Sequence, residues 1–246
     1  MTFEARIAQP QTVTHWPAVI TIDGPAGSGK STIGARVAQQ LGYLFFDSGI
    51  LYRALTWLAL RQGLRLSDAT ALVEVAERMD LVVRPPTQPD GRPYTVEVDG
   101  EDITWDLRRP EVDANVSEVS KHPAVRAALI PQQRRIAAGG GLVMVGRDIG
   151  TVVLPDAPLK IYLDAALEVR ARRRQTEQLE RARPADYQGI LDDMRRRDQI
   201  DGGRDVAPMK PAADAILIDT TRMTIGEVVA HVLGLVEQGR RRHVED

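Results

Sequence analysis

The stretch VITIDGPAGSGKST, residues 19–32, decides the fold. Its apolar, β-branched beginning predicts a short buried strand. The following GPAGSGKS fits the pattern G-x-x-x-x-G-K-[ST], and apolar residues at helical spacing then predict a helix over 33–41. A strand, a glycine-rich loop and a helix in this order predict a P-loop, which binds the phosphates of a nucleoside triphosphate.

Each part of this loop has a chemical reason. Glycines let the backbone turn tightly and bring its N–H groups close to phosphate oxygens, and the helix N-terminus adds partial positive charge there. We expect Lys30 to reach the β- and γ-phosphates and the Ser31 hydroxyl to help hold Mg²⁺, directly or through a water molecule. The alternative is a glycine-rich turn before an ordinary helix, which is much rarer for a full match.

Composition sets wider limits. A chain of 246 residues with 43% hydrophobic and 27% charged residues is long enough, and ordinary enough, for one large globular domain or for a core with an insertion. The net charge of −2 gives no general attraction to nucleic acid or to anionic membranes. The chain has no cysteine, which excludes disulfides, a cysteine nucleophile and cysteine-bound zinc.

The N-terminal residues and the hydropathy of the chain predict where in the cell the protein is located. No apolar run is long enough to span a bilayer, and the N-terminus lacks the apolar centre of a signal peptide. We therefore expect a cytoplasmic protein whose residues 1–17 form a disordered leader.

The remaining chain alternates between strands and helices. Short apolar runs predict four further strands, over 43–46, 142–145, 159–163 and 215–219. Because helical patterns separate them, the prediction is an α/β fold with a five-stranded parallel sheet that helices cover on both faces. We assign 18–79 and 108–246 to this core.

Residues 80–107 interrupt the alternation. Two β-rich runs, 81–83 and 94–98, flank a proline-rich loop, and a turn is expected over 98–103. We interpret this stretch as a small inserted β-rich subdomain; the alternative is an extra hairpin on the main sheet.

Polar residues follow several strands at the edge where open α/β sheets bind ligands. Ser48 could bind a ligand or cap a helix. Arg53 stands in the first turn of a predicted helix, which is unfavourable for a cation unless an anion is near, so phosphate binding is favoured. Arg147 and Asp148 could form an internal ion pair or face a polar ligand. Ser117 and Arg126, taken singly, are more typical of solvated helix positions.

Arginines gather in the sequence RARRR, residues 170–174, on a predicted helix. Their mutual repulsion favours anions nearby. A charged stretch, 176–186, follows, and the segment of about 172–188 is therefore expected to form a short, mobile, arginine-rich lid. A helix over 189–199 and a turn over 201–204 come next, and Thr224 begins the last helix, which is expected to end near Gly239.

Three classes of nucleotide-binding protein compete at this point. A GTPase switch should carry an N-K-x-D segment, which the chain lacks. A motor ATPase should have an apolar strand that ends in an acidic pair, and the strand ends here fit poorly. A small-molecule kinase needs cations for an acceptor and an arginine-rich cover, and the chain supplies both.

Five segments together resemble the bacterial cytidylate kinase family: GPAGSGKST, DSGILYR, GRDIGTVV, the RARRR helix and RRRDQIDGGRDVAPMKPAADA. The resemblance extends from about Val19 to Val236 and includes the β-rich insertion. It implies a P-loop kinase that transfers a phosphoryl group from MgATP to CMP and dCMP in pyrimidine nucleotide metabolism, with the insertion in the part that binds the monophosphate.

The resemblance also implies roles for single residues. ATP would be bound by Gly24, Pro25, Ala26, Gly27, Ser28, Gly29, Lys30, Ser31 and Thr32. CMP would be bound by Ser48, Arg53 and Arg147 at its phosphate, Ser117, Arg126 and Asp148 at its base, Arg197 and Asp201 at its sugar, and Arg204. The catalytic cations would be Lys30, Arg147, Arg170 and Arg173, with Arg174 as a further lid arginine.

Two alternatives stay open. One is a kinase of the same architecture with another acceptor, such as a different nucleoside monophosphate or shikimate. The other is a regulatory protein that binds ATP without turnover. We expect a monomer that binds neither nucleic acid nor membrane.

Overall fold

The computed structural model describes residues 17–84, 86–92, 94–180 and 184–245. The expected leader, Pro17 apart, lies outside these residues. The chain forms two compact units, one made by Ser48–Ala138 and the other by residues 17–47 and 139–245. We call them the insertion unit and the P-loop unit, and each is described by itself.

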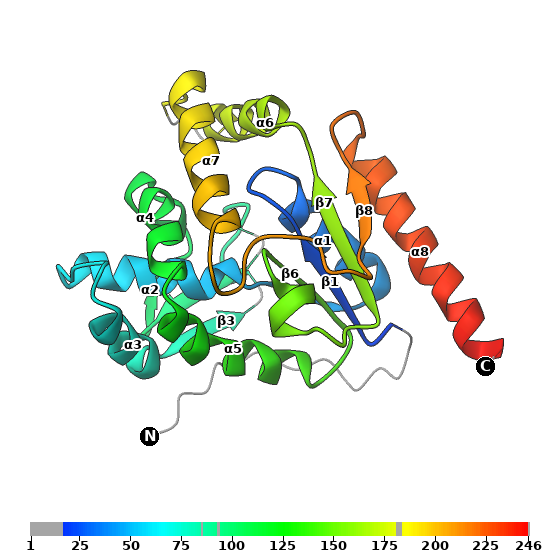
Figure 1. Ribbon diagram of the computed structural model, residues 1–246, viewed down its shortest axis with the longest axis horizontal. Helices are drawn as coiled ribbons and strands as arrows, with labels where there is room; N and C mark the ends of the chain where they lie inside the picture. Colours follow the sequence, from blue (N-terminus) through cyan, green and yellow to red (C-terminus); the bar gives the residue numbers. More distant parts are fainter. Residues whose placement is uncertain (1–16, 85, 93, 181–183, 246) are drawn as a thin grey trace. The chain divides into compact units, whose positions relative to one another are not determined.

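The P-loop unit contains the predicted five-stranded sheet (Figure 1). All pairings are parallel, in the order β2-β6-β1-β7-β8. The strands are β1 (Val19–Asp23), β2 (Leu44–Asp47), β6 (Leu142–Gly146), β7 (Leu159–Asp164) and β8 (Ile216–Asp219). Because the strands are parallel and in register, their carboxyl ends meet at one edge, where Asp23, Asp47, Asp164 and Asp219 each end a strand.

Successive side chains along each strand point to opposite faces of the sheet. Ile20 and Ile22 face an apolar core that the helices α1 (Lys30–Leu41) and α8 (Ile225–Glu245) complete. Thr21 and Asp23 face the other way, where the short π-helix η2 (Ile149–Val153) covers β1 and β6. The predicted α/β fold is confirmed.

Two helices extend beyond the carboxyl edge of this sheet, α6 (Leu167–Glu180) and α7 (Tyr187–Gly202), and they pack against each other through a small apolar cluster (Figure 1). The described part of the expected lid is therefore helical up to Glu180, and an Arg174–Glu177 ion pair one turn apart supports it. The predicted turn over 201–204 is wrong in part. Asp201 belongs to α7 because its buried ion pairs hold it in the helix.

Helix α8 begins after Thr224, as predicted, with a capping box: the Glu227 carboxylate accepts from the Thr224 N–H at 2.7 Å, and the Glu227 N–H donates to the Thr224 hydroxyl at 3.3 Å. It continues past Gly239, because glycine weakens a helix by only about 1 kcal/mol and does not end it.

The insertion unit consists of four helices, a 3₁₀ turn and a small antiparallel sheet. The helices are α2 (Gly49–Arg61), α3 (Ala69–Arg78), α4 (Pro110–Ser120) and α5 (Pro123–Ala137); the turn is η1 (Asp106–Arg108). The sheet has the order β3-β4-β5, with β3 (Leu81–Arg84), β4 (Thr95–Val98) and β5 (Glu101–Asp102). It is separate from the main sheet, so 80–107 is not a hairpin on that sheet.

The turn between β4 and β5 has positive φ angles, 52° at Asp99 and 82° at Gly100, which suits a type I′ hairpin. The compact unit around this sheet includes more of the chain than residues 80–107, the insertion expected from the sequence, because α2 packs against α4 and α3 packs against α5.

Candidate functional site: a P-loop beside a cluster of buried charges

The loop between β1 and α1 has the backbone that its glycines permit. Gly24, Gly27 and Gly29 have φ angles of 143°, 75° and 98°. A Cβ on Gly24 would lie 2.0 Å from the Leu163 carbonyl oxygen, so no other residue fits there. Ser28 is buried within the loop, and Thr32 is exposed on α1.

Lys30 is the first residue of α1 and its side chain is turned back over the loop. Its Nζ donates to the Pro25 carbonyl at 2.6 Å, and the residue is buried. Burial lowers the pKa of Lys30 to about 7, and the positive charge of Arg147 acts in the same direction, while Asp47 and Asp23 oppose the shift. A buried amine with so low a pKa, beside a loop of the phosphate-binding type, marks a site where an anion would restore the positive charge.

Ser31 and Asp47 form the pair of oxygen groups best suited to a hard cation. The Ser31 hydroxyl donates to the Asp47 carboxylate at 2.8 Å. Hydroxyl and carboxylate oxygens are the ligand types that Mg²⁺ prefers. No group of three or more histidine, aspartate or glutamate side chains that could hold a metal occurs in the described part of the chain. A cation here would therefore need phosphate and water oxygens as well.

Asp23 links the end of β1 to the loop that carries Arg147 and Asp148. Its buried carboxylate accepts the N–H groups of Ile149 at 2.8 Å and Gly150 at 2.7 Å. Burial raises the pKa of Asp23 to about 6, the two hydrogen bonds oppose this shift, and the neighbouring Asp148 charge adds to it.

Replacing Asp23 with asparagine should destabilise the protein more at about pH 5 than at about pH 7.5. The pKa of Asp23 is higher in the folded chain than the ordinary 3.8, so its contribution to stability is complete below pH 3.8 and is lost as the pH rises through about 6. Urea unfolding of wild type and variant at both pH values measures the difference. Asp156→Asn, at an exposed loop position, is the control; equal costs of Asp23→Asn at both pH values would contradict the prediction.

A buried carboxylate in α7 pairs with two arginines, one just after β6 and one just after α7. Asp201 forms ion pairs with both Arg147 and Arg204, and its side chain and that of Arg204 are almost fully buried. Burial raises the pKa of Asp201, but the charges of the two arginines outweigh burial and the net shift is downward. The sequence alternative of an Arg147–Asp148 pair is therefore wrong as to the partner, because the carboxylate that pairs with Arg147 lies 54 residues away. The buried Arg197 belongs to the same helix and adds positive charge near Asp201.

Two arginines of α6 are bound to the body of the P-loop unit. Arg170 is buried and donates to the Ala26 carbonyl of the P-loop at 3.1 Å and to the Asp198 carboxylate at 2.7 Å. Arg173 donates to the hydroxyl of Thr220 at 3.0 Å and to its carbonyl at 2.6 Å. The Thr220 hydroxyl also contacts the Ser28 carbonyl at 3.2 Å. Both arginines are thus connected to the P-loop by hydrogen bonds, Arg170 directly and Arg173 through Thr220.

In the insertion unit, Arg53 has a protein anion as its partner. Its Nη1 lies 2.7 Å from a carboxylate oxygen of Asp113 and donates to the Leu107 carbonyl at 2.8 Å. The anion that a cation in the first turn of α2 requires is supplied by Asp113, so the position of Arg53 does not by itself favour phosphate binding, which stays a prediction. Ser48 stands at the N-cap position of α2 without a capping hydrogen bond from its side chain, so the capping alternative is not supported.

Ser117 and Arg126 are both buried, with 3% and 2% of their surface exposed. Their interpretation as solvated helix positions is therefore wrong. Arg126 donates to the Ser120 carbonyl at 3.3 Å, and its guanidinium lies 5.3 Å from the centre of the Tyr52 ring. Burial of this charge is costly, and the Tyr52 ring and the Ser120 carbonyl each offset part of that cost.

Sequence reasoning missed a second group of residues in these clusters: Asp23, Asp47, Asp113, Asp198 and Thr220. For the aspartates and the threonine that end or follow strands, the signal was present, because polar residues at the carboxyl edge of a parallel sheet face the ligand site. For Asp113 and Asp198, which lie within helices, the sequence carries no such signal.

Comparison with known proteins gives a consistent result. The family model described as cytidylate kinase matches residues 20–238. A cytidylate kinase from Herpetosiphon aurantiacus is 52% identical over 220 residues, which cover 89% of this chain and 94% of the relative. The cytidylate kinase of Roseiflexus castenholzii is 51% identical over 221 residues, with the same coverage of both chains. That of a Geobacillus species is 46% identical over 219 residues, covering 89% of this chain and 96% of the relative.

Proposed function

We propose, since the chain belongs to the cytidylate kinase family, that it transfers the γ-phosphoryl group of ATP to CMP and dCMP, giving ADP and the cytidine diphosphate. The observation that best supports this proposal is that one unit contains both the P-loop lysine, Lys30, and Arg147, which forms an ion pair with Asp201. The positive charge of Arg147 adds to burial in lowering the pKa of Lys30. The presence of both cations suits a reaction in which a donor and an acceptor phosphate must both be neutralised.

We assign the donor to the P-loop, residues Gly24–Thr32, whose backbone N–H groups and Lys30 would hold the ATP phosphates. Ser31 and Asp47 would hold Mg²⁺ together with phosphate oxygens and water. When bound, the ion would neutralise charge on the β- and γ-phosphates. Asp47 is an addition to the residues proposed from the sequence.

The residues that we assign to the acceptor CMP are given for each unit by itself. In the insertion unit, Ser48 and Arg53 would contact the phosphate, and Ser117 and Arg126 the base. In the P-loop unit, the assigned contacts are Arg147 at the phosphate, Asp148 at the base, Arg197 and Asp201 at the sugar, and Arg204 as a further contact. Guanidinium groups bind phosphate through paired hydrogen bonds, and a carboxylate can accept from the amino group of cytosine.

The proposed mechanism is an in-line transfer with both substrates bound. No general base is needed, because the attacking CMP phosphate oxygen is already anionic at neutral pH. Lys30 and Arg147 would balance the charge that develops between the phosphates. Arg170, Arg173 and Arg174 would add to this when the lid segment, about 172–188, closes, and Arg170 and Arg173 would then exchange their contacts to Ala26 and Thr220 for phosphate.

Further features of the proposal concern the setting. We place the enzyme in the cytoplasm, as a monomer in pyrimidine nucleotide metabolism, without nucleic acid or membrane partners. Residues 80–107 would belong to the part that binds the monophosphate. Among the described helices, none has the length and apolar character needed to cross a membrane.

An ADP-release assay with MgATP tests the function. CMP, dCMP, UMP, AMP and shikimate are offered separately at equal concentration. Fast turnover with CMP and dCMP and little with the others is expected. Turnover with another acceptor would leave the kinase fold and discard the base assignments, and no turnover with any would favour a regulatory protein that binds ATP.

Asp148→Asn should relax the selectivity for cytosine, since an amide can donate to a ring carbonyl where a carboxylate only accepts. We expect the ratio of kcat/KM for CMP over UMP to fall by about tenfold or more, as for the loss of one base-reading contact. The ratios of CMP to UMP and of CMP to AMP are measured with the same assay. Unchanged ratios would remove Asp148 from base reading.

A further inference from the structure

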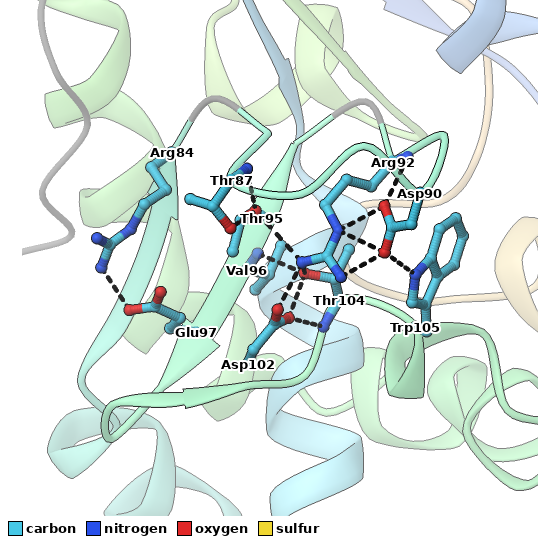
Figure 2. A network of polar contacts seen from close by, with 10 residues as sticks. All are labelled: Arg84, Thr87, Asp90, Arg92, Thr95, Val96, Glu97, Asp102, Thr104 and Trp105. Carbon is cyan, nitrogen blue, oxygen red and sulfur yellow. Dashed lines mark hydrogen bonds and ion pairs between the residues drawn. The ribbon is translucent and has the colours of Figure 1, made fainter.

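A buried arginine holds the small sheet of the insertion unit together (Figure 2). Arg92 donates through Nε and Nη2 to the Asp90 carboxylate, at 2.8 Å and 2.6 Å, and forms an ion pair with Asp102 on β5. Its Nη1 also lies 3.3 Å from the hydroxyls of Thr95 and Thr104. We call Asp90, Arg92, Thr95, Asp102 and Thr104 the Arg92 network.

The network is largely removed from solvent at its centre, with only 5% of the Arg92 side chain exposed. Hydrogen bonds from Arg92 and Trp105 hold the pKa of Asp90 well below its usual range. For Asp102, burial raises the pKa, but hydrogen bonds from Thr104 and Arg92 outweigh it and the net shift is downward. All members are therefore charged or hydrogen-bonded at neutral pH, which is the condition under which a buried polar network fixes one conformation.

Hydrogen bonds connect the Arg92 network to the residue that precedes the turn η1. Trp105, the residue before η1, donates its indole N–H to Asp90 at 2.8 Å (Figure 2). The Thr104 hydroxyl accepts from the Val96 N–H at 2.9 Å, which fastens the same segment to β4. Two residues after Trp105, Leu107 is almost fully buried, and its carbonyl is the one that accepts from Arg53.

We infer that the insertion positions Arg53: the Arg92 network fixes η1, and the Leu107 carbonyl, together with Asp113, holds the Arg53 guanidinium in place. This inference rests on the proposed function, in which Arg53 binds the acceptor phosphate. A guanidinium with fixed partners loses less conformational freedom on binding, so the insertion would raise the affinity for the phosphate group of CMP without touching it.

A double-mutant cycle tests the inference. CMP and cytidine affinities are measured by calorimetry for wild type, Arg92→Leu, Arg53→Ala and the double variant. We expect Arg92→Leu to weaken CMP binding about tenfold in the wild-type background and less than about twofold in the Arg53→Ala background, because the loss passes through Arg53. Cytidine, which has no phosphate, should bind equally to wild type and Arg92→Leu.

Arg84→Gln is the matched control, since it removes an arginine of the same sheet whose ion pair with Glu97 lies outside the Arg92 network (Figure 2). It should leave both affinities unchanged. Asp102→Asn is the milder variant, used in the same cycle if Arg92→Leu does not fold.

The outcomes separate the inference from the function on which it rests. If Arg53→Ala leaves CMP affinity unchanged while the enzyme still phosphorylates CMP, the phosphate role of Arg53 is wrong. If Arg53→Ala weakens CMP binding but the Arg92 effect is absent, is additive with it, or extends equally to cytidine, the positioning inference is wrong.

Discussion

Replacing Lys30 with alanine is expected to lower kcat by about 10²–10³-fold, the usual cost of removing one preorganised charge-stabilising group. The affinity for CMP should stay within about twofold, because the residues assigned to CMP do not include Lys30. Steady-state kinetics with MgATP and CMP give kcat, and calorimetry with CMP alone gives the affinity.

Lys210→Ala provides the control for this prediction, since Lys210 is exposed and should change neither quantity. A full loss of CMP binding in Lys30→Ala would contradict the separation of donor and acceptor groups. An unchanged kcat would remove Lys30 from the reaction.

Replacing Asp201 with alanine should lower the free energy of unfolding by about 3–5 kcal/mol, because it leaves the buried Arg204 side chain and the partly buried Arg147 side chain without their shared carboxylate. The midpoint of urea unfolding should fall accordingly, and CMP turnover should fall with it, since Arg147 loses the partner that orients it.

The same helix offers a matched control for Asp201. Asp193 forms an exposed ion pair with Arg196 at 2.7 Å, and Asp193→Ala should cost less than about 1 kcal/mol. If Asp201→Ala cost no more than Asp193→Ala, the buried cluster would not contribute to stability in the way its burial suggests.

The fold could be predicted from the sequence because its signals are local. The β-branched runs, the glycine spacing of the P-loop and the Asp99-Gly100 turn each determine their structure within a few residues. Element ends were harder. Asp201 extends α7 through contacts with Arg147, and Arg147 is far away in the sequence.

The partners of the site arginines could not be predicted for the same reason. Arg53 meets Asp113, and Arg147 meets Asp201, only after the chain has folded, and no spacing rule connects residues so far apart. The sequence predicted which cations belong to functional motifs, and that assignment stays a prediction. It could not show that protein carboxylates already pair with them. The Arg53 guanidinium therefore needs no bound phosphate to balance its charge, because Asp113 already does so and the Leu107 carbonyl helps to fix its position.

The low pKa of Lys30 makes binding of the nucleotide a proton-linked event. With its pKa lowered to about 7 by burial, Lys30 is expected to lose its proton in the free enzyme as the pH rises through that value. Because triphosphate oxygens favour the ammonium form, ATP binding in that range should take up a proton from the buffer, and its measured enthalpy should vary with the ionisation enthalpy of the buffer chosen. The affinity for ATP should then fall as the pH rises above about 7.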